Sequence, residues 1–246
     1  MDKSLFKTLI ICSFMATLVL FLDCIEIFIS LNENIDVLFL FDYSLNVGYW
    51  SNLLILICQF PLVLLPSLSP PKDLLKVGIV GGISIAIGCT LFCCINTLWL
   101  PLVDVNGSEF QSFLMHYNMT EANNSYFCLT PLILSNYNIA YFIASIYFVF
   151  LLSTLWSIVG YTIYLFVKNK YVTVFITYML YYYNPLLIGM INKLTGSSLY
   201  TSKNLFLGNF NFGVSIFGNI LYLTVFVLLA LVLIWGVICK MHYKVP

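Results

Sequence analysis

The segment YTIYLFVKNKYVTVFITYMLYYY, residues 161–183, decides the fold class of this chain. Two apolar and aromatic runs are separated in it only by Lys168, Asn169 and Lys170. Each run extends beyond the quoted segment, to about the 20 residues that a helix needs to cross a bilayer. Charged side chains between two such runs are typical of a tight turn at a membrane surface. The segment therefore predicts two membrane-spanning helices joined by a short turn.

The composition of the whole chain also favours a membrane protein. Of its 246 residues, 61% are hydrophobic and only 8% are charged, whereas a soluble domain carries about 25% charged residues. We see no internal repeat, so we expect one all-α, polytopic transmembrane domain over residues 1–246. Six apolar segments are the expected spans, at about residues 6–30, 50–68, 77–100, 138–167, 171–191 and 213–239.

The lysines orient these spans, because lysines near span ends are retained on the cytoplasmic side. With a cytoplasmic N-terminus, only Lys193 and Lys203 of the ten lysines fall outside the cell. We therefore expect both chain ends and the turn at residues 168–170 to be cytoplasmic. Residues 31–49, 101–137 and 192–212 are then external, and the loop at residues 101–137 is the longest of them.

Several classes of function lack their sequence signatures here. The net charge is zero, so no basic surface indicates a nucleic-acid partner. The chain has no P-loop, no His-Glu-x-x-His and no Gly-x-Ser-x-Gly, which are signatures of ATP binding, zinc proteolysis and serine hydrolysis. We therefore expect no catalytic, metal or cofactor site in this chain, and any ATPase activity would belong to a partner.

A few polar residues within the apolar segments are candidate functional residues. Asp23 and Glu26 lie three residues apart and so share one helix face. They are either water-exposed carboxylates at the end of the first span or contacts for a cation or substrate. Tyr181 and Tyr182 lie deep in the fifth span, where they either line a substrate path or anchor the helix through interfacial and interhelical contacts.

Two further patterns each allow two interpretations. Gly78, Gly82 and Ala86 form a stripe of small residues, which permits close packing within one chain or at a dimer seam. The segment at residues 67–76 follows the prolines that end the second span and is either a simple turn or a docking element for a cytoplasmic partner. Its candidate contact residues are Lys72, Asp73, Leu74, Leu75 and Lys76.

The layout resembles that of small ABC-2-type permease subunits of Gram-positive bacteria, which accompany lantibiotic-immunity and multidrug exporters. The residues that carry the resemblance are Trp156, Gly160, Lys168, Asn169, Lys170 and Tyr171, together with the six-span topology. The resemblance implies a multi-pass protein of a bacterial plasma membrane. It also implies a homo- or heterodimer with a second permease subunit, and a separate ATPase that powers export of a hydrophobic or peptide-like substrate.

In this interpretation, residues 67–76 contact the ATPase and transmit its movement to the membrane helices, and Lys168 and Lys170 provide a second contact. Three other functions stay open. The first is a non-transporting membrane protein that serves in immunity, sensing or assembly. The second is a membrane enzyme acting on lipid or peptidoglycan precursors, for which Asp23, Glu26 and the external acidic residues are the available groups. The third is a channel or secondary carrier.

Overall fold

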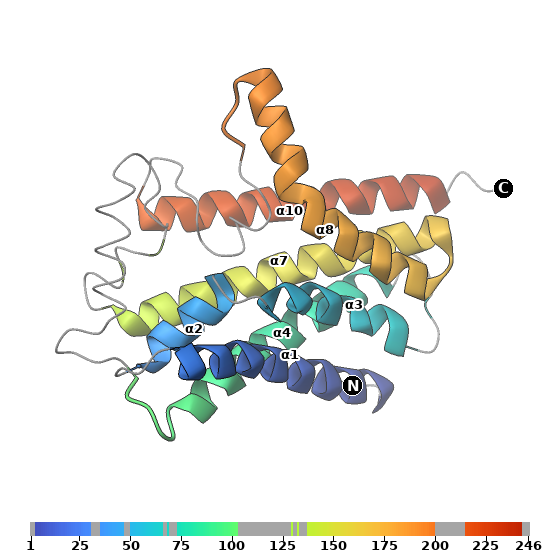
Figure 1. Cartoon of the computed structure of the whole chain (residues 1–246). Helices are drawn as coiled ribbons and strands as arrows, with labels where there is room; N and C mark the ends of the chain where they lie inside the picture. Colours follow the sequence, from blue (N-terminus) through green and yellow to red (C-terminus); the bar gives the residue numbers. More distant parts are fainter. Residues whose placement is uncertain are drawn as a thin grey trace.

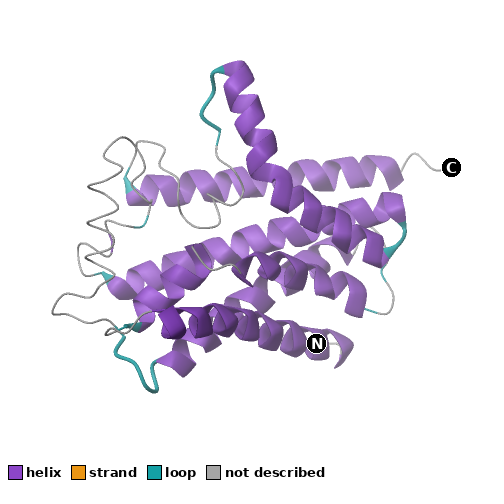
Figure 2. Cartoon of the chain, in the orientation of Figure 1, coloured by secondary structure: helices purple, strands orange, loops and turns teal. Residues whose placement is uncertain are grey.

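The chain folds into a bundle of helices in the computed structural model (Figure 1). No strand occurs within the residues that the structure describes, and turns and short loops link the helices there (Figure 2). The all-α class expected from the sequence is confirmed. The described residues are 3–30, 35–46, 50–65, 68, 73–102, 129, 132, 137–199 and 215–242, without the side chains of 26–30, 46, 241 and 242.

Five helices in the described part are long and apolar enough to cross a membrane. They are α1 (Lys3–Ser30), α4 (Asp73–Asn96), α7 (Asn138–Val167), α8 (Lys170–Thr195) and α10 (Ile216–His242). The remaining expected span, at about residues 50–68, corresponds to the short 3-10 helix η1 (Trp50–Leu53) and α3 (Leu54–Leu64), and a further helix, α2 (Val37–Asn46), precedes it. α2 and the η1–α3 unit meet at an angle of 61°. The described residues thus contain five candidate spans, or six if this bent pair is one span.

The helices α1, α3, α4 and α7 form an inner bundle, and α8 and α10 pack on the outside of it. α4 packs against α7, α1 and α3, whereas α8 packs on α7 and α3, and α10 packs on α7. Within their most apolar windows, 11% of residues are buried in α8 and in α10, against 67% in α7. Apart from its contacts with the inner bundle, each outer helix therefore presents its apolar side chains to the surroundings, as a lipid-facing helix does.

Glycines allow α4 to approach α7 closely. A Cβ atom at Gly78 would lie 2.5 Å from the side chain of Ile158, and one at Gly82 would lie 2.0 Å from Thr154 Oγ1. Both distances are far below van der Waals contact, so only glycine fits there without displacement. The stripe of small residues predicted from the sequence therefore packs within the chain, and a dimer seam through these two glycines is wrong.

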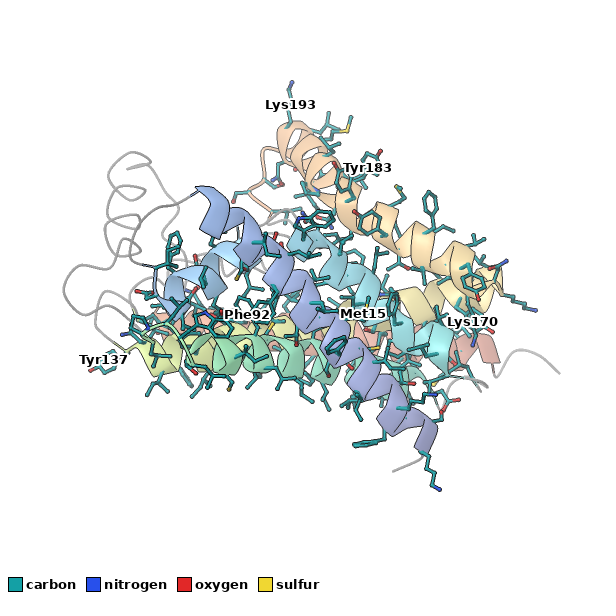
Figure 3. All side chains as sticks on the ribbon, turned by 60° about the horizontal axis from the view of Figure 1, so that its bottom comes forward. Met15, Phe92, Tyr137, Lys170, Tyr183 and Lys193 are labelled. Atoms are coloured by element: carbon teal, nitrogen blue, oxygen red, sulfur yellow. The ribbon has the colours of Figure 1, made fainter. Side chains whose placement is uncertain are left out.

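The helix ends meet in one hydrophobic cluster at one end of the bundle. Side chains from the start of α1 and α4 and from the end of α3, α7 and α10 pack together there, including those of Leu5, Leu65, Leu74, Leu165 and Ile238. We call this the lysine end, because every described lysine except Lys193 lies on the helix turns and termini gathered there (Figure 1). Figure 3 shows Lys170 and Lys193 at opposite ends of α8. We call the opposite end of the bundle the far end.

The expectation of an external loop at residues 31–49 is wrong for its second half. Residues 37–46 form α2, and most of the described side chains of α2 are buried. The first amides of α2 are all bonded: Val37 N donates to Pro101 O, Leu38 N to Leu102 O, and Phe39 N to Asp36 Oδ1 at 2.7 Å. These bonds satisfy the backbone donors that a helix start leaves open, so this polar-looking segment can pack into the core.

Candidate functional site

The turn between α7 and α8 consists of two residues. Lys168 ends α7 with a left-handed backbone (φ 55°), and its N–H donates to Tyr164 O at 2.8 Å. Asn169 then begins α8, because its side-chain oxygen accepts from the N–H groups of Tyr171 and Val172 at 3.1 and 3.2 Å. Asparagine is among the best residues at this capping position. The tight turn predicted from the sequence is confirmed.

Lys170 joins this turn to the end of α3. Its Nζ donates to Leu65 O at 2.7 Å and lies 3.4 Å from Val63 O. The last carbonyls of a helix lack partners within the helix, and a cation near them also interacts favourably with the helix dipole. The half-buried Lys170 therefore caps α3 as well as beginning α8.

The first turn of α4 contains the other residues expected to contact a partner. Asp73 and Lys76 form a 3.8 Å ion pair within this turn. Leu74 is buried in the cluster at the lysine end, whereas Leu75 is exposed. Residues 73–76 of the segment expected at 67–76 are the first turn of α4 and not part of a separate turn; their contact with a partner stays a prediction. Lys72 lies outside the described residues.

The two segments expected to couple to a partner do meet in space. The end of α3 is bonded to Lys170, and Leu65 and Leu74 share one hydrophobic cluster with Leu165 of α7. We call this arrangement the junction: the last turn of α3 (62–65), the first turn of α4 (73–77) and the α7–α8 turn (167–171). Among the predicted contacts in it, Leu75 and Lys168 are exposed and Lys76 is partly exposed.

A group of polar side chains lies deep in the inner bundle. Gln59 of α3 is fully buried, and its Nε2 donates to Trp156 O of α7 at 2.8 Å. Ser157 is also fully buried, and its Oγ donates to Cys58 O at 2.6 Å and to Ser153 O at 2.8 Å. Hydrogen bonds of this kind join helices in a medium that offers no water. They tie α3 to α7.

The sequence identified no role for this group. Gln59 was visible as an amide in an apolar run, and a polar residue inside a span is itself a signal of an interhelical or functional contact. Ser157 carried no such signal, because serine is common in membrane helices and its partner is a backbone carbonyl on another helix.

The two candidate tyrosines of α8 lie differently. Tyr181 is buried and its ring packs edge-on against the ring of Trp156, with centroids 5.6 Å apart. Tyr182 is exposed and stacks with Tyr178 at 6.3 Å. Tyr181 therefore belongs to the interface of α8 with the inner bundle, and Tyr182 faces the surroundings of the bundle together with Tyr183 (Figure 3).

The carboxylates at the far end are structural groups of the fold. Asp23 is fully buried, and its Oδ1 accepts from Trp50 N at 2.8 Å, so α1 holds the start of η1. The interpretation of Asp23 as a water-exposed carboxylate is thus wrong, and the structure gives this residue a helix-capping role; its contact with a cation or substrate stays a prediction. The side chain of Glu26 lies outside the described residues. Asp42 of α2 accepts from the Tyr141 hydroxyl of α7, a pair that the sequence did not indicate.

Within the described ranges, no three acidic, histidine or cysteine side chains lie together as metal ligands would. Comparisons with protein-family models, with curated proteins and with solved structures find no match to the chain. The geometry of the junction, the buried polar group and the outer helices is therefore the basis on which a function is proposed.

Proposed function

We propose that this chain is the membrane-spanning permease subunit of an ABC-type exporter, which a separate ATPase subunit powers. The cargo is a hydrophobic or peptide-like molecule, and the membrane is the plasma membrane of a bacterium. The observation that carries the proposal is the junction, where the end of α3, the start of α4 and the α7–α8 turn meet at the lysine-rich end of the bundle.

The junction has the properties that a coupling surface needs. It is small, and its exposed side chains combine the cation of Lys168 with apolar and aromatic groups such as Leu75 and Tyr171. Lys76 adds a second, partly exposed cation. Packing and hydrogen bonds join four helices there: the end of α3, the start of α4, the end of α7 and the start of α8. A force applied to this surface therefore acts on four helices at once, because packed helices move as units.

The orientation of the chain supports the same proposal. A cytoplasmic ATPase reaches the junction only if the lysine end faces the cytoplasm. The excess of lysine at that end predicts this orientation. An even number of crossings, six, also puts the start of α1 and the end of α10 on the same side of the membrane.

Purification of the full-length chain from its own membranes in a mild detergent tests the proposal. We expect mass spectrometry to find a P-loop ATPase in near-stoichiometric amount. Lys168→Glu reverses a charge at the junction and should reduce its recovery by tenfold or more. Lys193→Glu is the matched control at the far end and should leave the recovery unchanged. A chain that purifies without any nucleotide-binding partner would contradict the proposal.

A second candidate is a non-transporting membrane protein that acts in immunity, sensing or assembly by binding another membrane component. The exposed apolar surfaces of α8 and α10 favour it, since Phe217, Val232 and Leu233 are all more than two-thirds exposed. The same purification distinguishes the two candidates. An integral membrane partner recovered without an ATPase, and lost when Val232 and Leu233 are both replaced by bulky tryptophans, would support this second function.

A further inference from the structure

α8 presents a polar face to the inner bundle and an apolar face outwards. Lys170, Thr173, Thr177 and Tyr181 follow one another at intervals of three or four residues and so share one side of the helix. Thr173 and Thr177 are fully buried and Tyr181 is nearly so, while Phe175 on another side of the helix is exposed. For a helix at the edge of a membrane bundle, a buried stripe of hydroxyl groups is a surface that water or a polar group can wet.

The threonines of this stripe do not require the contact with α3 and α7 for their hydrogen bonds. Thr173 Oγ1 donates to Asn169 O at 2.8 Å, and Thr177 Oγ1 donates to Thr173 O at 2.9 Å. Both bonds stay within α8 and its cap. α8 can therefore move away from the bundle without breaking them, and the hydroxyl oxygens can then accept bonds from whatever enters.

The inner bundle also carries an unused acceptor on α3, which packs against both α7 and α8; this oxygen lies against Gly160 of α7. Gln59 is fully buried, and its Nε2 donates a hydrogen bond to Trp156 O, but its Oε1 has no hydrogen-bond partner. The ring of the same Trp156 packs against Tyr181 of α8. A buried amide oxygen without a donor is unfavourable in a membrane interior, so the neighbourhood of this contact favours entry of a donor group.

The attachment of α8 is strong at the lysine end and weak beyond its middle. At the lysine end, the two-residue turn, the Asn169 cap and the Lys170 bonds to α3 hold the helix. After Tyr181 the exposure rises, to 58% at Tyr182, 63% at Leu186 and 86% at Leu194. Figure 1 shows this last part of α8 projecting away from the other helices.

From this arrangement we propose that α8 is a hinged gate. It pivots at Lys170, separates from α3 and α7 at the Tyr181–Trp156 contact, and opens a hydrated seam towards the far end. The seam accepts molecules with hydrogen-bond donors, such as peptide amides, between the threonine stripe and Gln59. Its use in transport rests on the proposed function, but the movement itself requires neither cargo nor ATPase.

Fluorine NMR of the full-length protein tests the gate, with 5-fluorotryptophan incorporated and the protein placed in lipid nanodiscs. The chain has four tryptophans, and Trp156→Phe assigns the relevant signal. We expect two signals for Trp156, a major closed form and a minor open form, with only the minor form broadened by a water-soluble gadolinium chelate. Trp235, on α10, is the control within each sample and should give one signal.

The hinge is tested with two matched lysine variants. Lys170→Met removes the bonds to α3 and should raise the open population at least threefold, whereas Lys168→Met changes an exposed lysine of the same turn and should not. If Lys170→Met fails to fold, as a general shift of all four signals would show, Tyr181→Ala replaces it and should also raise the open population.

Three results would overturn the inference. One is a single Trp156 signal in the wild type and in the folded variants. Another is an equal response to Lys168→Met and Lys170→Met. The third is a minor form that the water-soluble chelate does not reach, because the seam would then be dry. None of these results depends on whether an ATPase purifies with the chain, so the gate and the proposed function fail separately.

Discussion

Replacing Gly81 by alanine should destabilise the inner bundle strongly, although the change adds only one methyl group. Gly81 of α4 lies where α3 and α7 meet. A Cβ atom there would lie 2.0 Å from Ser157 Oγ and 2.8 Å from the backbone oxygen of Cys58. The serine cannot turn aside freely, because its Oγ donates to that same carbonyl at 2.6 Å. The carbonyl belongs to a helix backbone, so it cannot rotate away from the new methyl group either.

The magnitude follows from two costs. Overpacking a closely packed core costs about 1–3 kcal/mol, and the interhelical hydrogen bond that is disturbed contributes about 0.6 kcal/mol in a membrane. Alanine also favours a helix over glycine by up to about 1 kcal/mol, which partly offsets these costs. Gly236→Ala is the control for this last contribution. Gly236 also lies within a helix, α10, but a Cβ there meets nothing within 4 Å, so the gain in helix propensity cancels when the two variants are compared. Gly81→Ala should therefore be less stable than Gly236→Ala by about 2–4 kcal/mol.

Reversible unfolding by sodium dodecyl sulfate in mixed micelles, followed by circular dichroism, measures this difference. Adding Ser157→Ala to Gly81→Ala should recover part of the loss, since the Oγ contact disappears while the approach to the carbonyl remains. Equal stability of Gly81→Ala and Gly236→Ala would refute the close approach of α4 to α3 and α7 on which the inner bundle depends.

Two further predictions concern other contacts between helices. Asp23→Ala leaves the Trp50 N–H without this acceptor, so it should lower the free energy of unfolding by about 1–3 kcal/mol. In the same assay, Asp73→Ala, which removes a partly exposed ion pair within one helix turn, should cost less than about 1 kcal/mol. Equal losses would argue against the helix-capping role of Asp23. A double-mutant cycle of Tyr147→Phe and Thr224→Val should give a coupling energy of about 0.6 kcal/mol. The reason is that the hydroxyl groups of Tyr147 on α7 and Thr224 on α10 lie 3.0 Å apart. Strictly additive effects of the two substitutions would show that this bond does not hold α10.

The spans were the most predictable part of the fold, and the reason is physical. The predicted fourth span, residues 138–167, coincides with α7, Asn138–Val167, because length and apolar content dominate where lipid is the solvent. The two-residue turn after it was equally predictable, since Asn169 and the two lysines suit a cap and a membrane surface. Local sequence carried both features.

The features that depend on distant partners were not predictable. α2 resembled a polar loop because Asp36, Asp42 and Ser44 interrupt its apolar residues. Its burial depends on a cap by Asp36 and on a bond between Asp42 and Tyr141, 99 residues away. The same applies to Lys170, whose position in a turn between two apolar runs was visible in the sequence but whose carbonyl partners lie at the end of α3. A single sequence does not show which helices become neighbours.

The most direct test of the account asks on which side of the membrane the two ends of α8 lie. The proposed function requires the junction in the cytoplasm and Lys193 outside. Variants Lys168→Cys and Lys193→Cys are treated in intact cells with a membrane-impermeant maleimide, and mass spectrometry reads the modification of each peptide. The account predicts rapid modification at position 193 and modification at position 168 only after the cells are permeabilised. Modification at position 168 in intact cells, or at both positions to the same extent, would contradict it.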